Sequence, residues 1–177
     1  MNFCPGTEDA LLQKRQDLIL YRQLSGNAAM FVTAWFGMVD INTGKVMCGS
    51  AGHNPPALIN DETGEVKYLD YKPQLVLGAM QNIAYKNYIF QMKENEKLML
   101  YTDGIVEAHD VNNKLYGEER FLKSMETHKD LNIRDLCENL AFEVDEYSKG
   151  QEQFDDYSLL CFTYKGAQEN KNLSKDF

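Results

Sequence analysis

A short apolar run that ends in an aspartate most constrains how this chain can fold. Leu98-Met-Leu-Tyr101 has the length and composition of a buried strand, and Thr102-Asp103-Gly104 stops it with a carboxylate and a turn residue. A carboxylate at the mouth of a buried strand is costly to desolvate unless a cation lies opposite it. Asp103 therefore predicts a positive charge at this end of the strand.

A second apolar run begins directly after another pair of aspartates. Asp155 and Asp156 precede the strand-like segment Tyr157–Tyr164. If the two strands are antiparallel neighbours, Asp103 and Asp155 meet at the same edge of one sheet. No cysteine or histidine stands beside them, so the ligands would be oxygen atoms, which favour Mg²⁺ or Mn²⁺ over zinc. A single strand-end aspartate before glycine is more often a turn former, so the metal interpretation depends on the pair.

The chemistry of such a site would be hydrolysis of a phosphate ester, because a hard divalent cation activates water and binds phosphoryl oxygens. His53, in Ala51-Gly-His-Asn-Pro-Pro56, is either a general acid or a turn residue held by backbone hydrogen bonds. The segment Asp110–Asn113 has the start of a calcium loop, but Leu115 stands where that loop needs glycine. Cys48 has no basic neighbour to stabilise a thiolate, which argues against a cysteine-nucleophile phosphatase.

Composition limits the partners and the compartment. With 27 acidic against 18 basic residues, the net charge of −9 disfavours nucleic-acid binding, which requires a basic face. The four cysteines show no C-x-x-C spacing and predict reduced thiols in a cytoplasmic protein. No run has the ~18 apolar residues of a membrane span, and the N-terminus lacks the features of a signal peptide. A membrane anchor elsewhere in a longer parent protein remains open.

Hydrophobic periodicity predicts an α+β fold. Hairpin-connected strands are expected first, then two helices, then a last strand. The expected strands are 30–39, 45–50, 57–60, 65–69, 85–92, 97–102 and 156–164, with 97–102 pairing back on 85–92. The expected helices are 7–24, 117–128 and 133–147, the last burying Leu136, Leu140, Phe142 and Val144. The polar segment 165–177 is expected to be a flexible tail.

Seven ordered stretches resemble one protein family. They are Met30-Phe-Val-Thr-Ala-Trp-Phe-Gly37, Asn42-Thr-Gly44, Ala51-Gly-His-Asn-Pro-Pro56, Leu77-Gly78, Leu100-Tyr-Thr-Asp-Gly-Ile-Val-Glu-Ala108, Tyr116-Gly-Glu-Glu-Arg120 and Phe154-Asp-Asp-Tyr-Ser-Leu-Leu160. The family is the stage II sporulation protein E type of phosphatase. It is a bacterial branch of the metal-dependent (PPM) serine/threonine phosphatases related to protein phosphatase 2C. The resemblance covers roughly residues 8 to 164.

The resemblance implies an antiparallel β-sandwich flanked by helices, with two Mn²⁺ or Mg²⁺ ions at one edge. A metal-bound water would attack phosphoserine or phosphothreonine in a regulatory protein similar to an anti-anti-sigma factor. Asp103 and Asp155 match metal ligands of the family, and no further catalytic residue is implied. Gly104 matches the tight turn beside the first ligand, and Asp156 adjoins the second.

The chain departs from the family pattern at its N-terminal side. The family begins with a Gly-Asp strand whose aspartate bridges both metals, followed by Asp-x-Ser-Gly-x-Gly, and neither occurs here. Residues 1–164 are therefore expected to form the C-terminal two-thirds of the domain, with weak or no activity alone. Exposed sheet edges would favour a homodimer. Two alternatives stay open: a non-catalytic partner-binding or dimerisation module, and a one-metal hydrolase of small phosphate esters.

Overall fold

The computed structural model describes residues 31–72, 74–80, 83–151 and 155–167. The predicted helix at 7–24 and most of the predicted tail lie outside these residues. The chain divides into two compact units. Unit 1 comprises Met1–Gly37, Met47–His53 and Tyr71–Tyr88, and unit 2 comprises Met38–Val46, Asn54–Asp70 and Ile89–Phe177.

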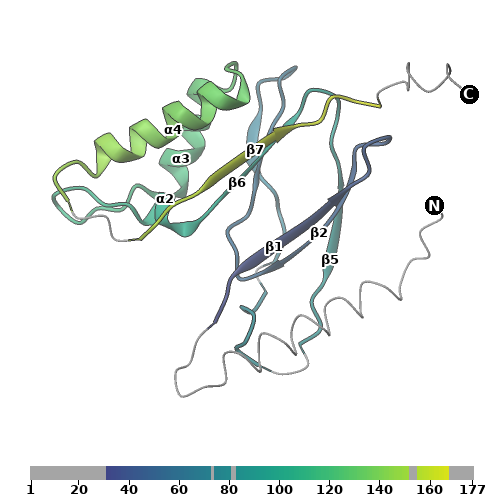
Figure 1. The fold of residues 1–177 in the computed structure, drawn as a ribbon, viewed down its shortest axis with the longest axis horizontal. Coiled ribbons are helices and arrows are strands. Elements are labelled where there is room, and N and C mark those ends of the chain that lie inside the picture. The colour runs from purple at the N-terminus through teal and green to yellow at the C-terminus, as the bar shows by residue number, and fades with distance from the viewer. Residues whose placement is uncertain (1–30, 73, 81–82, 152–154, 168–177) are drawn as a thin grey trace, which may run out of the picture. The chain divides into compact units, whose positions relative to one another are not determined.

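A three-stranded sheet has the order β1-β2-β5 (Figure 1). Its strands are β1 (Ala34–Val39), β2 (Lys45–Ala51) and β5 (Asn87–Gln91). The predicted hairpin turn between the first two strands is confirmed, since the Asp40 N–H donates to the Lys45 carbonyl at 2.9 Å. Gly44 closes this turn with a φ of +73°, a conformation that favours glycine.

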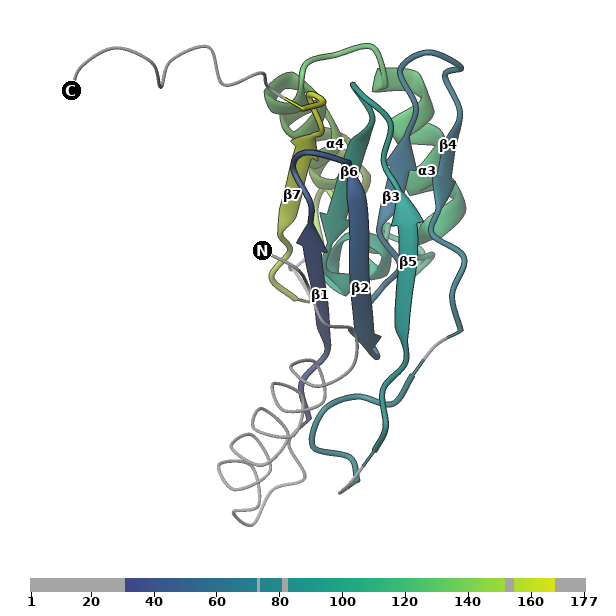
Figure 2. The same ribbon diagram turned by 90° about the vertical axis from the view of Figure 1, so that its right-hand side faces the viewer.

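A four-stranded antiparallel sheet has the order β4-β3-β6-β7 (Figure 2). Its strands are β3 (Ala57–Ile59), β4 (Val66–Tyr68), β6 (Lys97–Tyr101) and β7 (Leu159–Thr163). The prediction that 97–102 pairs back on 85–92 is wrong, because β6 lies between β3 and β7 while β5 joins the other sheet. Burial explains the difference: β6 is almost continuously buried, as a central strand should be, whereas β5 alternates between exposed and half-buried residues at a sheet edge.

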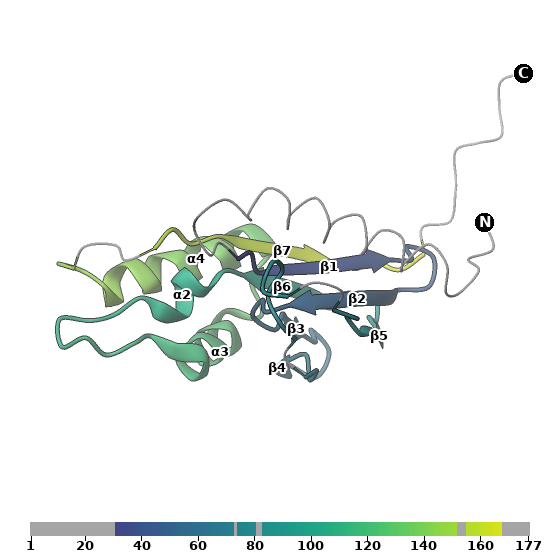
Figure 3. The ribbon, with the colours of Figure 1, turned by 90° about the horizontal axis from the view of Figure 1, so that it is seen from below.

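The described part of unit 2 contains the helices α2 (Asp103–Glu107), α3 (Gly117–His128) and α4 (Ile133–Tyr147) (Figure 3). The two longer helices have the predicted bounds. The Asn132 side chain caps α4 by accepting from the N–H groups of Arg134 and Asp135 at 3.1 and 3.0 Å. No helix in the described part of the chain is both long and apolar enough to cross a membrane.

The core of unit 2 lies between the four-stranded sheet and the helices. Leu136, Leu140 and Val144 of α4 are buried as predicted, because residues four apart share one helix face. Phe142 lies about half a turn away from that face, and its predicted burial is wrong, since it is 63% exposed. The buried cluster contains Ala57, Ile59, Val66, Met99, Tyr101, Ile105, Tyr116, Phe121, Met125, Leu136, Leu140 and Val144.

Candidate functional site

The antiparallel pair β6–β7 brings the segments that carry Asp103 and Asp155 to one edge of the sheet. Tyr101, the last residue of β6, lies opposite Leu159, the first residue of β7. The pairing continues one step further, because the Thr102 N–H donates to the Ser158 carbonyl at 3.1 Å. The predicted antiparallel neighbourhood of the two strands is therefore confirmed, and the role of the two carboxylates as metal ligands stays a prediction.

Asp103 begins helix α2, so the prediction that Thr102-Asp103-Gly104 forms a turn is wrong. Thr102 is extended, with φ −88° and ψ 161°, and its hydroxyl does not cap the helix because it accepts from the Ser158 N–H at 2.9 Å. The Asp103 side chain is half-buried. Among the described residues no ion pair or hydrogen bond engages its carboxylate. The cation predicted opposite Asp103 is therefore not a side chain of the described part.

Gly104 is buried where α2 passes close to the segment that precedes β7. A Cβ atom on Gly104 would lie 2.7 Å from the Asp156 carbonyl oxygen and 3.2 Å from the Tyr157 Cβ. The glycine is required for this close approach and not for the predicted tight turn. It holds the first turn of α2, and with it Asp103, against the chain that follows Asp155.

Asp155 and Asp156 are both exposed at the start of the segment that leads into β7. The Asp156 N–H donates to the Asp155 Oδ1 at 2.8 Å, which orients the Asp155 carboxylate. Carboxylate oxygens are the donors that Mg²⁺ and Mn²⁺ prefer, so the donor type fits these ions. The described residues nevertheless contain no cluster of three or more His, Cys, Asp or Glu side chains placed to hold a metal.

His53 belongs to unit 1, whereas Asp103 and Asp155 belong to unit 2. Its Nδ1 lies 3.3 Å from the Thr33 hydroxyl, and its carbonyl accepts from the Ser50 hydroxyl at 3.2 Å. These contacts fit the interpretation of His53 as a turn residue held by hydrogen bonds. A role as general acid stays a prediction.

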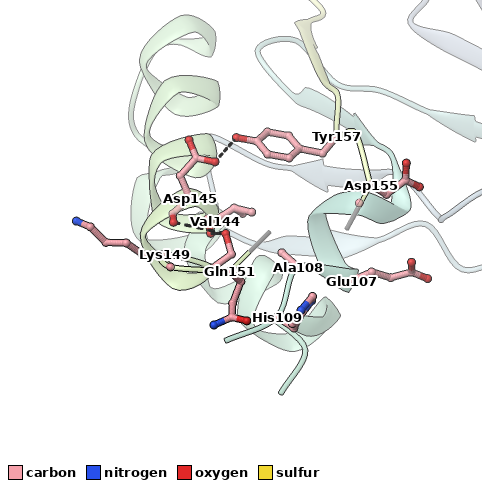
Figure 4. A pocket seen from close by; sticks show the side chains of 12 residues that line it. Glu107, Ala108, His109, Val144, Asp145, Lys149, Gln151, Asp155 and Tyr157 are labelled. Atoms are coloured by element: carbon pink, nitrogen blue, oxygen red, sulfur yellow. Dashed lines mark hydrogen bonds between the residues drawn. The ribbon is translucent and has the colours of Figure 1, made fainter. Parts of the chain in front are cut away.

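A pocket of about 220 Å³ opens beside Asp155 and Gly104 (Figure 4). Figure 4 shows Asp145 of α4 and Tyr157 pointing toward one another, and the Tyr157 hydroxyl donates to the Asp145 Oδ1 at 2.7 Å. Burial, together with this bond to a carboxylate, raises the pKa of Tyr157 to about 12. No sequence pattern predicts this hydrogen bond, because only folding brings the two side chains together. The remaining lining residues are Glu107, Ala108, His109, Val144, Ser148, Lys149, Gly150 and Gln151.

Comparison with known families identifies the chain. The family model described as Stage II sporulation protein E (SpoIIE) matches residues 6–165. The chain belongs to this family. The phosphoserine phosphatase RsbU of Bacillus subtilis is 25% identical over 141 residues, which make up 78% of this chain and 41% of RsbU. Protein IcfG of Synechocystis is 26% identical over 136 residues, which make up 77% of this chain and 21% of IcfG. The chain thus spans less than half the length of either relative.

Solved structures share the fold. The SiaA-PP2C domain of Pseudomonas aeruginosa superimposes with a TM-score of 0.72 at 20% identity, covering 84% of this chain and 58% of that chain. The phosphatase domain of SpoIIE from Bacillus subtilis gives a TM-score of 0.62 at 16% identity, covering 96% and 79%. The predicted α+β, PPM-type fold and the family resemblance are therefore confirmed.

Proposed function

We propose that this chain provides part of a metal-dependent serine/threonine protein phosphatase domain that acts in bacterial signalling. The observation that carries the proposal is the antiparallel β6–β7 pair in a chain of the SpoIIE family. Asp103 follows the end of β6, and Asp155 precedes the start of β7 at the same edge of the sheet. The reaction is hydrolysis of a phosphate monoester on a regulatory phosphoprotein. Because one fold can host unrelated functions, these two carboxylates carry the functional assignment.

Asp103 and Asp155 would hold Mn²⁺ or Mg²⁺ through their carboxylate oxygens. When bound, such an ion supplies an activated water and neutralises phosphoryl oxygens. The chain's own contribution is positioning. The paired hydrogen bonds between Thr102 and Ser158 fix the spacing of the two segments, and the Asp156 N–H orients the Asp155 carboxylate. Family membership implies two ions, so other segments of the complete domain would supply the remaining ligands.

The proposed substrate is a phosphorylated regulatory protein similar to an anti-anti-sigma factor. This is supported by RsbU and RsbP of Bacillus subtilis, both named phosphoserine phosphatases, which are 25% and 26% identical to this chain. The net charge of −9 fits a protein substrate better than a nucleic acid. A cytoplasmic location follows from the same proposal.

A second candidate function is a partner-binding or dimerisation module of the same fold. One observation favours it: β7 is an edge strand of its sheet in the described part of the chain, and its Leu160 is 62% exposed. Edge strands pair readily with other chains. On this view the chain is non-catalytic and forms homodimers through its sheet edges. Under the phosphatase proposal the incomplete domain instead has weak or no activity alone.

The test measures Mn²⁺ binding and Mn²⁺-dependent hydrolysis in the same preparations of this chain. The substrates are a phosphoserine peptide and p-nitrophenyl phosphate, and the variants are Asp103→Asn, Asp155→Asn and, as a matched exposed control, Asp130→Asn. The phosphatase proposal predicts that Mn²⁺ affinity falls at least about tenfold in the first two variants and is unchanged in the control. Equal Mn²⁺ affinity in all four proteins would overturn the ligand assignment. Mn²⁺ binding with little or no turnover agrees with an incomplete phosphatase domain, whereas a parent protein that binds no Mn²⁺ would favour the module.

A preference for one substrate separates the protein phosphatase from the small-ester hydrolase. If the phosphoserine peptide is turned over with the higher kcat/KM, the protein substrate is supported. If p-nitrophenyl phosphate is preferred and the peptide is not hydrolysed, the one-metal hydrolase of small phosphate esters replaces it.

A further inference from the structure

Two cysteines meet where helix α4 packs against strand β7. Cys137 lies in the first half of α4, and Cys161 is the central residue of β7. Both side chains are half-buried against the same core cluster, and their thiols are hydrogen-bonded to one another. Neither thiol is part of the site formed around Asp103 and Asp155.

Both cysteines lie on regular secondary structure, which determines the direction of their side chains. Cys161 lies opposite Met99 of β6 in the antiparallel register, so their side chains occupy the same face of the sheet. Met99 is fully buried in the core beneath the helices. Cys137 directly follows the fully buried Leu136 on α4. Both cysteines therefore lie on regular elements that pack against one another, and not in loops.

The two thiols differ in acidity. The hydrogen bond from Cys161 lowers the pKa of Cys137 to about 7, although burial opposes the shift. The same contact, together with burial, raises the pKa of Cys161 far above its ordinary range. At neutral pH, Cys137 is therefore partly ionised to the thiolate, and the adjacent Cys161 retains its proton. This combination is typical of cysteines that react with peroxides and are then resolved by a neighbour.

Cys48 provides the contrast within the same chain. It is buried in β2, and burial raises its pKa to about 11. A thiol with these properties is protonated and shielded at neutral pH, so its reaction with oxidants is slow.

We propose that Cys137 and Cys161 form a redox-active dithiol that hydrogen peroxide converts into a disulfide between α4 and β7. The Cys137 thiolate attacks one peroxide oxygen, so that an S–O bond forms, the O–O bond breaks and the leaving hydroxide takes up a proton to become water. The resulting sulfenic acid is attacked by the sulfur of Cys161. The S–S bond forms, the S–O bond breaks, and the Cys161 proton leaves with hydroxide as a second water. Two thiols are thereby oxidised and one peroxide is reduced.

The disulfide would covalently tie α4 to the strand that follows Asp155. The Tyr157–Asp145 hydrogen bond already joins these two segments, so the cross-link would reinforce a contact that exists in the reduced protein. The proposal does not depend on phosphatase activity, and it would hold equally for a binding module.

The experiment uses the full chain with Cys4→Ser, which removes the N-terminal thiol as a competing partner. The protein is treated with hydrogen peroxide, quenched in acid, alkylated and mapped by mass spectrometry. We expect a peptide pair joined through Cys137 and Cys161, lighter by two hydrogen atoms than the reduced peptides and restored by dithiothreitol. Its rate of formation should fall about tenfold from pH 8 to pH 6, because the thiolate fraction of a group with a pKa near 7 falls by that factor.

Three variants in this background complete the test. In Cys161→Ser, peroxide should carry Cys137 to the sulfinic and sulfonic acids, because no thiol is left to resolve the sulfenic acid. In Cys137→Ser, Cys161 should stay reduced. The matched control Cys48→Ser should form the cross-link like the parent. The proposal is overturned if the parent protein over-oxidises Cys137 without a cross-link, or if both thiols survive peroxide that oxidises free cysteine. Both of these outcomes are measured on the Cys4→Ser parent, so they do not depend on whether the other variants fold.

Discussion

The backbone and hydroxyl of Thr102 bind the backbone of Ser158 in both directions. The Thr102 N–H donates to the Ser158 carbonyl at 3.1 Å, and the Ser158 N–H donates to the Thr102 Oγ1 at 2.9 Å. A strand pair would normally fray at this point, because Asp103 starts a helix and Ser158 precedes β7. The hydroxyl takes the place of a ladder carbonyl, so the spacing between the segments that carry Asp103 and Asp155 is fixed by hydrogen bonds.

Replacing Thr102 by valine should weaken both stability and metal binding. Thr102→Val keeps the shape of the side chain but leaves the Ser158 N–H without its acceptor, which costs about 1 kcal/mol of unfolding free energy. Thr102→Ser retains the hydroxyl and serves as the matched control. Urea unfolding and Mn²⁺ titration measure the two effects. If valine and serine behave alike in both measurements, the hydroxyl does not position the site.

Gly104 should not tolerate a methyl group. The Cβ of Gly104→Ala would meet the Asp156 carbonyl oxygen at 2.7 Å, so the helix or the segment before β7 must move, at a cost of about 1–3 kcal/mol. Gly49 in β2 offers the matched control, because a Cβ there would meet no atom nearer than 3.6 Å. Gly49→Ala should therefore unfold at nearly the same urea concentration as the parent. Equal stability of the two variants would show that the close approach at Gly104 is easily relieved.

The sequence predicted the elements of this fold better than their connections. The helices 117–128 and 133–147 have their predicted bounds, because capping residues and a helical period are local signals. The neighbourhood of β6 and β7 could also be inferred, since each carried an aspartate at the matching end. Strand β5 was assigned to the wrong partner, because sheet membership depends on tertiary packing, which no local pattern records.

The candidate site shows the same division. The sequence singled out Asp103 and Asp155 from the residue types at strand ends, a pattern that is visible locally. It missed the contact of Gly104 with Asp156 and the bond from Tyr157 to Asp145, which join positions that only folding brings together. The sequence predicts Lys97 only as the first residue of a strand, whereas its side chain is 6% exposed and forms an ion pair with Asp61. Buried polar contacts of this kind have no periodic signature.

A buried and an exposed lysine ion pair of unit 2 should differ widely in their contribution to the free energy of unfolding. The buried Lys97 Nζ lies 2.7 Å from the Asp61 Oδ1 and donates to the Lys129 carbonyl at 2.6 Å. Lys97→Ala leaves Asp61 and a carbonyl without their donor, and we expect a loss of about 3 kcal/mol. The exposed pair of Lys67 and Glu65 is the control, and Lys67→Ala should cost less than about 0.5 kcal/mol. Chemical denaturation of the two variants measures the difference. Similar losses would mean that burial does not decide the strength of these pairs.

Acid should weaken the contact between α3 and α4 through Glu143. Its carboxylate accepts from the Ser124 hydroxyl and lies 2.7 Å from the His128 Nε2. Burial by itself would raise the pKa of Glu143, but the bonds to Ser124 and His128 outweigh it and hold the pKa below the ordinary value of 4.5. A carboxyl group with a lowered pKa in the folded protein stabilises it above the unfolded pKa. That stabilisation is lost as the pH falls through the folded pKa.

Glu143→Gln should therefore be less stable than the parent at pH 7 by about 1 kcal/mol and should lose less stability than the parent on acidification from pH 5 to pH 3. Glu126→Gln, on the exposed part of α3, is the matched control and should follow the parent at every pH. Urea unfolding at a series of pH values gives the slopes directly. If the Glu143 carboxylate links the two helices, removing it must flatten the plot of unfolding free energy against pH. A Glu143→Gln plot that runs parallel to the parent's between pH 5 and pH 3 would contradict this prediction.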